Sequence, residues 1–177
     1  MTIQKPPSQA GCTWIEECIE ECSASSVYVE EHGIRATFRN PRRKQVRKIY
    51  FDGCYFEAGF GRRADFIVSL VDRIDVIVEL KGSDSNLTGK SGAVEQVEST
   101  LQTWNADEGH SPRVAALIIY GRIMAKKKLP GRIPGALAER SAIEGQFLKR
   151  HKILLLIHEH GERQFSFNDF LRKNDVR

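Results

Sequence analysis

Residues 64–82 read ADFIVSLVDRIDVIVELKG, two apolar runs separated by the short segment 71–73. Seven alternate positions are apolar: Phe66, Val68, Leu70, Ile74, Val76, Val78 and Leu80. Side chains alternate along a strand and directly opposed residues share a face, so a hairpin that turns at 71–73 gives both runs one common apolar face. This register pairs Phe66 with Val78 and Val68 with Val76.

The same register brings three polar residues together. Asp65 lies opposite Glu79, and Lys81 follows two residues farther along the same face. A single Asp/Glu-x-Lys tripeptide is weak evidence, because a chain of this length contains on the order of one by chance. Here the apolar pattern sets the register independently, so we expect the three side chains to converge.

Two carboxylates and a lysine at the end of a hairpin predict a divalent-cation site. Mg²⁺ takes oxygen ligands and commonly binds one or two carboxylates together with phosphate oxygens of a substrate. Asp65 and Glu79 would be the carboxylate ligands, and the Leu80 carbonyl would add a third oxygen. Lys81 would orient or activate an attacking water and stabilise phosphate charge.

The alternative is a solvent-facing salt-bridge cluster, since one face of a hairpin often carries charge. Ile67 and Ile77 share that face, however, and we expect helices to cover both sides of the sheet. Charged groups on a covered face are costly without a partner, so the cation site is the favoured interpretation.

The rest of the chain predicts a single α/β (α+β) domain over 12–177 after a flexible tail at 1–11. Periodicity and turn residues predict the following order: a helix at 13–24, a hairpin of 27–29 and 34–38, strands at 46–51 and 55–60, the central hairpin, a helix at 92–105, a strand at 114–120, a loop at 129–135, a helix at 136–150, a strand at 153–158 and a short helix at 167–173.

Composition narrows the setting. No run approaches the roughly 18–20 apolar residues of a membrane helix, and the N-terminus has no hydrophobic signal segment. The four cysteines, Cys12, Cys18, Cys22 and Cys54, form no metal-binding spacing, so we expect small buried thiols in a reducing cytoplasm. The net charge of +4 is modest, but basic residues cluster at 35–48 and 122–132, where phosphate backbones would be attracted.

Four segments together resemble the PD-(D/E)XK nuclease superfamily, especially small bacterial members with an ELKG strand and a following Glu-Gln helix. They are Asp52-Gly53-Cys54, Ala64-Asp65-Phe66, Glu79-Leu80-Lys81-Gly82 and Ala93-Val94-Glu95-Gln96-Val97-Glu98. The resemblance covers about 45–158. Two positions depart from the pattern, with Ala64 in place of the leading proline and Thr100 in place of a tyrosine often found after Gln96.

The resemblance implies a restriction-endonuclease-like core, with a mixed central sheet flanked by helices. It implies that Asp65 and Glu79 bind Mg²⁺ or Mn²⁺, that Lys81 assists the attacking water and that Gln96 points toward the active site. The implied activity is phosphodiester hydrolysis in nucleic acid, DNA rather than RNA, in a cytoplasmic defence or mobile-element setting. A homodimer or a partner protein would supply specificity. Some members add a glutamate from the first helix, for which Glu21 is the candidate.

Expected contacts to nucleic acid come from the basic residues Arg42, Arg43, Lys44, Arg62, Arg63 and Lys90. Two other functions stay open. One is a non-catalytic nucleic-acid-binding or interaction module with the same fold. The other is nucleotide binding by 84–91, which nearly matches a P-loop but has Asp84 at the first glycine position. His158 and His160 are expected to be surface residues.

Overall fold

The computed structural model describes residues 7–55, 61–82, 87–88, 92–104, 111–121 and 134–173. Its core is a seven-stranded mixed sheet in the order β1-β2-β5-β6-β7-β8-β9. Strands β1, β2, β5, β6 and β7 are antiparallel neighbours, whereas β7, β8 and β9 are parallel. The bounds are β1 Cys12–Trp14, β2 Ile19–Cys22, β5 Val46–Tyr50, β6 Phe66–Leu70, β7 Ile74–Lys81, β8 Val114–Tyr120 and β9 Leu155–Glu159.

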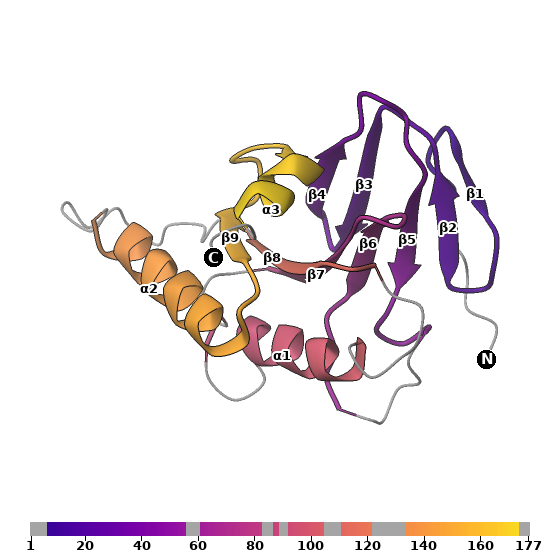
Figure 1. The fold of residues 1–177 in the computed structure, drawn as a ribbon. Helices are drawn as coiled ribbons and strands as arrows, with labels where there is room; N and C mark the ends of the chain where they lie inside the picture. The colour runs from indigo at the N-terminus through magenta and orange to yellow at the C-terminus, as the bar shows by residue number, and fades with distance from the viewer. Residues whose placement is uncertain are drawn as a thin grey trace.

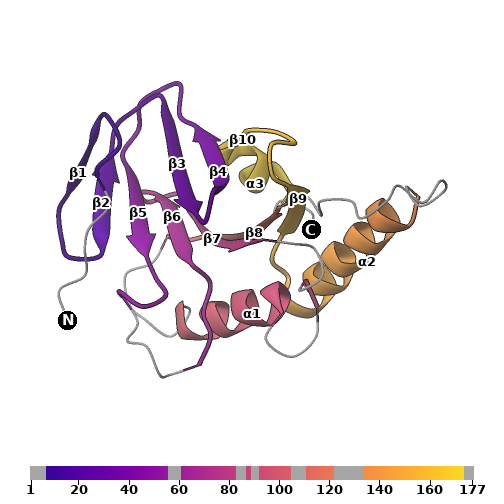
Figure 2. The ribbon, with the colours of Figure 1, turned by 180° about the vertical axis from the view of Figure 1, so that it is seen from behind.

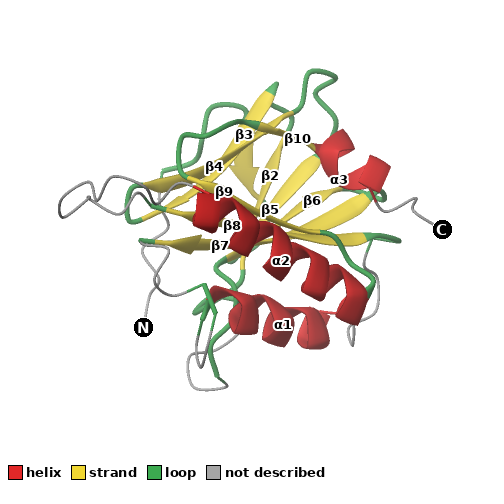
Figure 3. Cartoon of the chain, turned by 90° about the vertical axis from the view of Figure 1, so that its left-hand side faces the viewer, coloured by secondary structure: helices red, strands yellow, loops and turns green. Residues whose placement is uncertain are grey.

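A second, three-stranded sheet has the order β10-β4-β3, from β3 Ser26–Glu31, β4 Ile34–Arg39 and β10 Phe165–Ser166. The helices are α1 Ala93–Trp104, α2 Pro134–His151 and α3 Phe167–Lys173. Figure 1 and the reverse view in Figure 2 show β3 and β4 on one side of the large sheet and α1 on the other. In Figure 3, α1 and α2 run side by side.

The central hairpin has the predicted register. Phe66 pairs with Val78 and Val68 with Val76, and the turn at 71–73 is closed by a hydrogen bond from the Arg73 N–H to the Leu70 carbonyl (2.9 Å). All residues of β6 are buried, and so is β7 as far as Leu80. The alternating pattern in this part of the sequence therefore determines the pairing.

The two faces of the large sheet are covered differently. One face, with Phe66, Val68, Val76 and Val78, packs on the inward residues of the small sheet and on α3. We call it the double-sheet face. The other, with Ile67, Ile77 and Ile118, packs on α1 and α2 and is called the helix face. The sequence predicts helices on both faces of the large sheet. This is wrong for the double-sheet face, most of which is covered by the strands of the small sheet.

The helix expected at 13–24 is wrong. The segment forms the β1–β2 hairpin, in which Cys12 pairs directly with Cys22. The apparent helical spacing of its apolar residues is interrupted by a bend at 15–18, after which Glu20 and Cys22 face inward by strand alternation. The apolar residues of two short strands and a bend together imitate the spacing of one helix.

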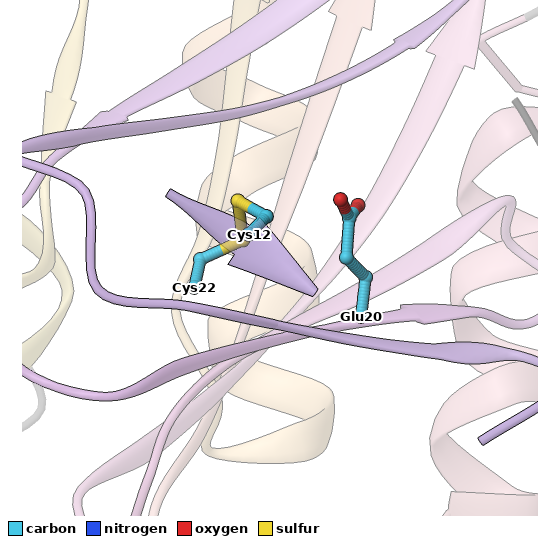
Figure 4. Close-up of side chains that lie close together, drawn as sticks. All are labelled: Cys12, Glu20 and Cys22. Carbon is cyan, nitrogen blue, oxygen red and sulfur yellow. A yellow bond between two sulfur atoms is a disulfide. The ribbon is translucent and has the colours of Figure 1, made fainter. Parts of the chain in front are cut away.

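The expectation of free thiols is also wrong. Cys12 is bonded to Cys22 within the β1–β2 hairpin, and Cys18 is bonded to Cys54, which ties the bend to the segment after β5. Figure 4 shows the first bridge beside Glu20. Disulfides persist mainly in oxidising environments, so the cysteine pattern does not support a reducing compartment.

A buried ion pair lies near this edge of the molecule. The Lys48 ammonium on β5 is 2.5 Å from a Glu20 carboxylate oxygen, and both side chains are almost fully buried. Tyr50 donates to the same carboxylate (3.4 Å), and the Lys48 ammonium lies 5.7 Å from the Tyr28 ring centroid. Lys48 is on the buried, double-sheet face of β5, and Glu20 supplies the counter-charge that this position needs.

Most other elements agree with expectation. The hairpin of β3 and β4, strands β5, β8 and β9, and helices α1, α2 and α3 all form within a few residues of the predicted bounds. The mixed α+β class is confirmed. Gln9, expected in a flexible tail, is anchored by hydrogen bonds to Ser26 and Tyr28, whereas 1–6, 56–60 and 129–133 lie outside the described residues. Within the described residues, no helix combines the length and apolar character needed to cross a membrane.

Candidate metal centre

Asp65 lies immediately before β6, at the end of the central hairpin where β7 also ends. Its Oδ2 accepts a hydrogen bond from the Leu80 N–H (2.7 Å), and its own carbonyl accepts one from the Phe51 N–H (2.9 Å). The Asp65 side chain thus accepts the hydrogen bond of the Leu80 N–H at the point where the backbone pairing of β6 with β7 ends. This brings the Asp65 carboxylate beside the Leu80 peptide unit, as the register predicts.

Glu79 is on the helix face and its side chain is fully buried. Its ion-pair partner is the Lys81 ammonium, two residues along the same face of β7. Among the described residues, neither Glu79 carboxylate oxygen has a hydrogen bond of acceptable geometry, although the Lys81 ammonium and the Asp65 N–H both act to lower the pKa of Glu79. A buried carboxylate that accepts no hydrogen bond of good geometry is costly, and a bound cation would offset that cost.

Gln96 connects Lys81 to the segment before Asp65. Its Oε1 accepts a hydrogen bond from the Lys81 ammonium, and its Nε2 donates to the Arg63 carbonyl (3.1 Å). Gln96 is buried on the first turns of α1. The predicted convergence of Asp65, Glu79, Lys81 and Gln96 is therefore present in the geometry.

Thr100 is a site residue that the sequence analysis did not assign. Its hydroxyl accepts a hydrogen bond from the Ala64 N–H (2.7 Å) and donates to the Gln96 carbonyl one turn earlier (2.9 Å). Thr100 is fully buried. The residue that replaces the expected tyrosine thus fixes the backbone directly before Asp65.

Burial is the main cause of the raised pKa values of the two carboxyl groups. The pKa of Asp65 is raised to about 9, first by burial and then by the negative charges of Glu79 and Glu31, whereas the Leu80 N–H lowers it. Burial also raises the pKa of Glu79 to about 7, although Lys81 opposes the shift. The raised pKa values mean that protons compete with a divalent cation for both groups.

Glu31 is a second residue that the sequence analysis missed. It is the last residue of β3, and its carboxyl group hydrogen-bonds to that of Asp65. The charge of Glu31 also raises the pKa of Asp52, after burial as the main cause, whereas Arg63 and Lys81 lower it. Strand alternation was the available signal, because Glu31 continues the inward-facing row of Val27 and Val29.

The donor set fits a hard divalent cation such as Mg²⁺ or Mn²⁺, because it consists of carboxylate oxygens, and those of Glu79 are buried without a hydrogen bond of acceptable geometry among the described residues. Asp65 and Glu79 would hold the ion. Glu31, Asp65 and Glu79 do not all lie within 4.8 Å of one another. The Leu80 peptide unit is in place, and its carbonyl remains a predicted ligand.

One group of described residues does bring three potential ligand atoms that close together, namely Cys12, Glu20 and Cys22. Figure 4 shows that the two sulfur atoms are bonded to each other. A disulfide offers no thiolate, and Glu20 is already paired with Lys48, so we assign no metal to this group.

The predicted nucleic-acid contacts are divided between two ends of the sheet. Arg62 and Arg63 immediately precede Ala64 at the end of β6 that carries Asp65, and the Arg63 carbonyl accepts the hydrogen bond from Gln96. Arg42, Arg43 and Lys44 precede Val46, which pairs with Leu70 at the opposite end of β6. Because β6 spans five residues, that segment is roughly 15 Å or more from Asp65.

Three further predictions concern Glu21, His158 and the P-loop-like segment 84–91. Glu21 is not on a helix; it pairs with Arg47 (3.3 Å), in line with Ser69 at the far end of β6. His158 is mostly buried and contacts Glu162 (3.2 Å), and burial lowers its pKa. Lys90 and most of the P-loop-like segment 84–91 lie outside the described residues.

No family model, curated protein or solved structure matches the chain.

Proposed function

We propose that the chain is a divalent-metal-dependent nuclease that hydrolyses phosphodiester bonds in nucleic acid. The observation that carries the proposal is the fully buried Glu79 carboxylate beside Asp65 and Lys81, with no hydrogen bond of acceptable geometry to its oxygens among the described residues. The meander β5-β6-β7 and the crossover through α1 to the parallel strand β8 are compatible with a restriction-endonuclease-like core.

In this proposal, Asp65 and Glu79 hold a Mg²⁺ or Mn²⁺ ion. When bound, such an ion lowers the pKa of water and offsets the negative charge that develops on the phosphate. Asp65 is held for that task through its bond to the Leu80 N–H and through the Thr100 hydroxyl, which fixes the preceding residue.

Lys81 would orient the attacking water and donate to a phosphate oxygen. Its ammonium has three N–H donors, two of which face Glu79 and Gln96. In this proposal the third donates to a water or a phosphate oxygen. During hydrolysis a water oxygen forms a bond to phosphorus, the bond to the leaving oxygen breaks, and that oxygen ends protonated.

Arg62 and Arg63 would contact the phosphate backbone next to the scissile bond. Arg42, Arg43 and Lys44 would contact a more distant part of a long substrate, which favours extended DNA over a mononucleotide. A homodimer or partner protein remains the expected source of specificity. A cytoplasmic location is compatible with this proposal only if the fold tolerates reduction of its two disulfides.

The test is a cleavage assay on plasmid DNA, single-stranded DNA and RNA, with Mg²⁺ or Mn²⁺ and with a chelator. Lys81→Met should reduce metal-dependent cleavage at least about 100-fold, whereas Lys149→Met, an exposed lysine near the end of α2, should leave it unchanged. Equal cleavage by the wild type and Lys81→Met would reject the assignment. Binding without cleavage by the wild type would favour the non-catalytic module.

A further inference from the structure

The tip of the β3–β4 hairpin carries a carboxylate to the candidate metal centre. Glu31 is followed by the two-residue turn His32-Gly33, and both turn residues have positive φ (48° and 77°). Positive φ at both central residues is characteristic of the tight hairpin turn whose twist matches the flanking strands. The turn pairs Glu31 with Ile34 and thereby fixes where the side chain of Glu31 emerges.

Strand alternation places Glu31 on the inward side of the small sheet. Val27 and Val29 precede it on that side and are almost fully buried. Glu30, on the outward side, is paired with Arg35 across the hairpin. The two neighbouring glutamates thus face opposite directions, and only Glu31 faces the large sheet.

The hairpin tip lies against the ends of β7 and β8. A Cβ atom on Gly121 would lie 2.5 Å from the Gly82 carbonyl oxygen and 3.0 Å from Ile34 Cδ1. Ile34, the partner of Glu31, therefore lies against Gly121, the residue after Tyr120, and Gly121 in turn packs on the Gly82 carbonyl directly after Lys81. This contact positions Glu31 beside Asp65, and their carboxyl groups are hydrogen-bonded.

We propose that Glu31 is a third carboxylate ligand of the divalent cation held by Asp65 and Glu79. Two ionised carboxylates in contact repel one another, and a bound cation reverses that interaction. The fully buried Glu79 carboxylate, whose two oxygens accept no hydrogen bond of acceptable geometry among the described residues, is an independent indication that this cluster takes a ligand. The inference rests on the metal site of the proposed function and adds a ligand from a separate sheet.

Ligation by Glu31 requires a small closure. The three carboxyl groups do not all lie within 4.8 Å of one another, whereas ligands of Mg²⁺ lie about 2.1 Å from the ion. The Glu31 side chain is 41% exposed and ends a strand, so it has the freedom to move inward. Cation binding should therefore order the β3–β4 tip.

The test is a titration of the full-length chain with Mn²⁺, in which free Mn²⁺ is measured by electron paramagnetic resonance without nucleic acid. Glu31→Gln should weaken binding at least about tenfold, and Asp65→Asn should weaken it further. Glu30→Gln, the neighbouring outward-facing glutamate, should bind Mn²⁺ like the wild type.

Unchanged Mn²⁺ affinity in Glu31→Gln, with loss in Asp65→Asn, would overturn the role of Glu31 and leave the Asp65–Glu79 site intact. No Mn²⁺ binding by the wild type would overturn both. If Mn²⁺ binding depends on Glu31 but no nucleic acid is cleaved, the ligand assignment stands and the proposed nuclease activity fails.

Discussion

At the scale of single residues, the candidate centre depends on how two carboxyl groups are held when no cation neutralises them. Asp65 is fixed by backbone contacts and Glu79 by burial, and both have raised pKa values. The folded chain therefore binds protons more tightly at these positions than the unfolded chain does. Such a group stabilises the fold at low pH and loses that contribution as pH rises.

This effect predicts a pH dependence of stability in the presence of a chelator. The pKa of Asp65 is about 9 in the folded chain against an ordinary value of 3.8, so its contribution should decline between about pH 4 and pH 9. Asp65→Asn keeps an acceptor for the Leu80 N–H but cannot ionise. Between pH 5 and pH 9, the unfolding free energy measured in urea should fall less for Asp65→Asn than for the wild type. An equal fall in the two proteins would contradict the raised pKa of Asp65.

Thr100 offers a second prediction at this scale. Thr100→Val removes the hydroxyl that accepts the Ala64 N–H and leaves a buried donor without a partner, which should cost about 1–3 kcal/mol of unfolding free energy. Thr103→Val is the matched control, because the Thr103 hydroxyl also bonds the carbonyl one turn earlier but has no strand contact among the hydrogen bonds of the described residues. Equal costs in urea unfolding would mean that the Ala64 contact contributes nothing.

At the scale of elements, the centre is assembled from the ends of strands. Gly121 follows β8 and packs so closely on the Gly82 carbonyl that no side chain fits. Gly121→Ala should force apart the ends of β7 and β8 and the β3–β4 tip, lowering the melting temperature and the Mn²⁺ affinity together. Gly145→Ala in α2 is the control, because its Cβ meets no atom and should stabilise by about 0.5–1 kcal/mol. Similar behaviour of the two variants would refute the close approach.

The sequence predicts best those elements whose pattern has a single solution. In the central hairpin, a shift of one residue would move every apolar side chain to the wrong face, so the register and the meeting of Asp65 with Glu79 could be derived. The Glu79-Lys81 pair and the α1 position of Gln96 also followed from local pattern.

The missed features depend on contacts between distant segments. Glu31 and Asp65 are 34 residues apart, and no local pattern shows that the β3–β4 tip reaches the end of β7. The sequence predicts a helix in place of the β1–β2 hairpin because the apolar residues of its short strands and bend imitate helical spacing. The buried pair of Lys48 and Glu20 likewise joins residues 28 positions apart on neighbouring strands, and no local pattern predicts it.

At the scale of the whole molecule, the large sheet joins a parallel half that carries Glu79 and Lys81 to an antiparallel edge tied by disulfides. The Cys18–Cys54 bridge spans 36 residues and the Cys12–Cys22 bridge spans 10. Each closes a loop whose entropy in the unfolded chain would otherwise be larger. The disulfides should therefore set much of the global stability without touching the centre.

Reduction of the two disulfides tests whether they contribute to global stability without affecting the metal centre. Dithiothreitol should lower the unfolding free energy by about 3 kcal/mol per disulfide, measured in urea, while Mn²⁺ affinity of the still-folded protein changes little. The paired serine variants at Cys12 and Cys22, and at Cys18 and Cys54, separate the two contributions. Four reactive thiols in the denatured, unreduced protein would show that the bridges do not form.

The most direct test of the central claim is the rate of Mg²⁺-dependent nucleic-acid cleavage by Glu79→Gln. Glutamine keeps the shape of the side chain but removes the buried charge that would hold the ion. Glu98→Gln on α1, where the glutamate pairs with Arg150 and His151, is the control. We predict that Glu79→Gln loses at least about 100-fold in rate while Glu98→Gln cleaves like the wild type. Cleavage by Glu79→Gln at the wild-type rate would contradict the account.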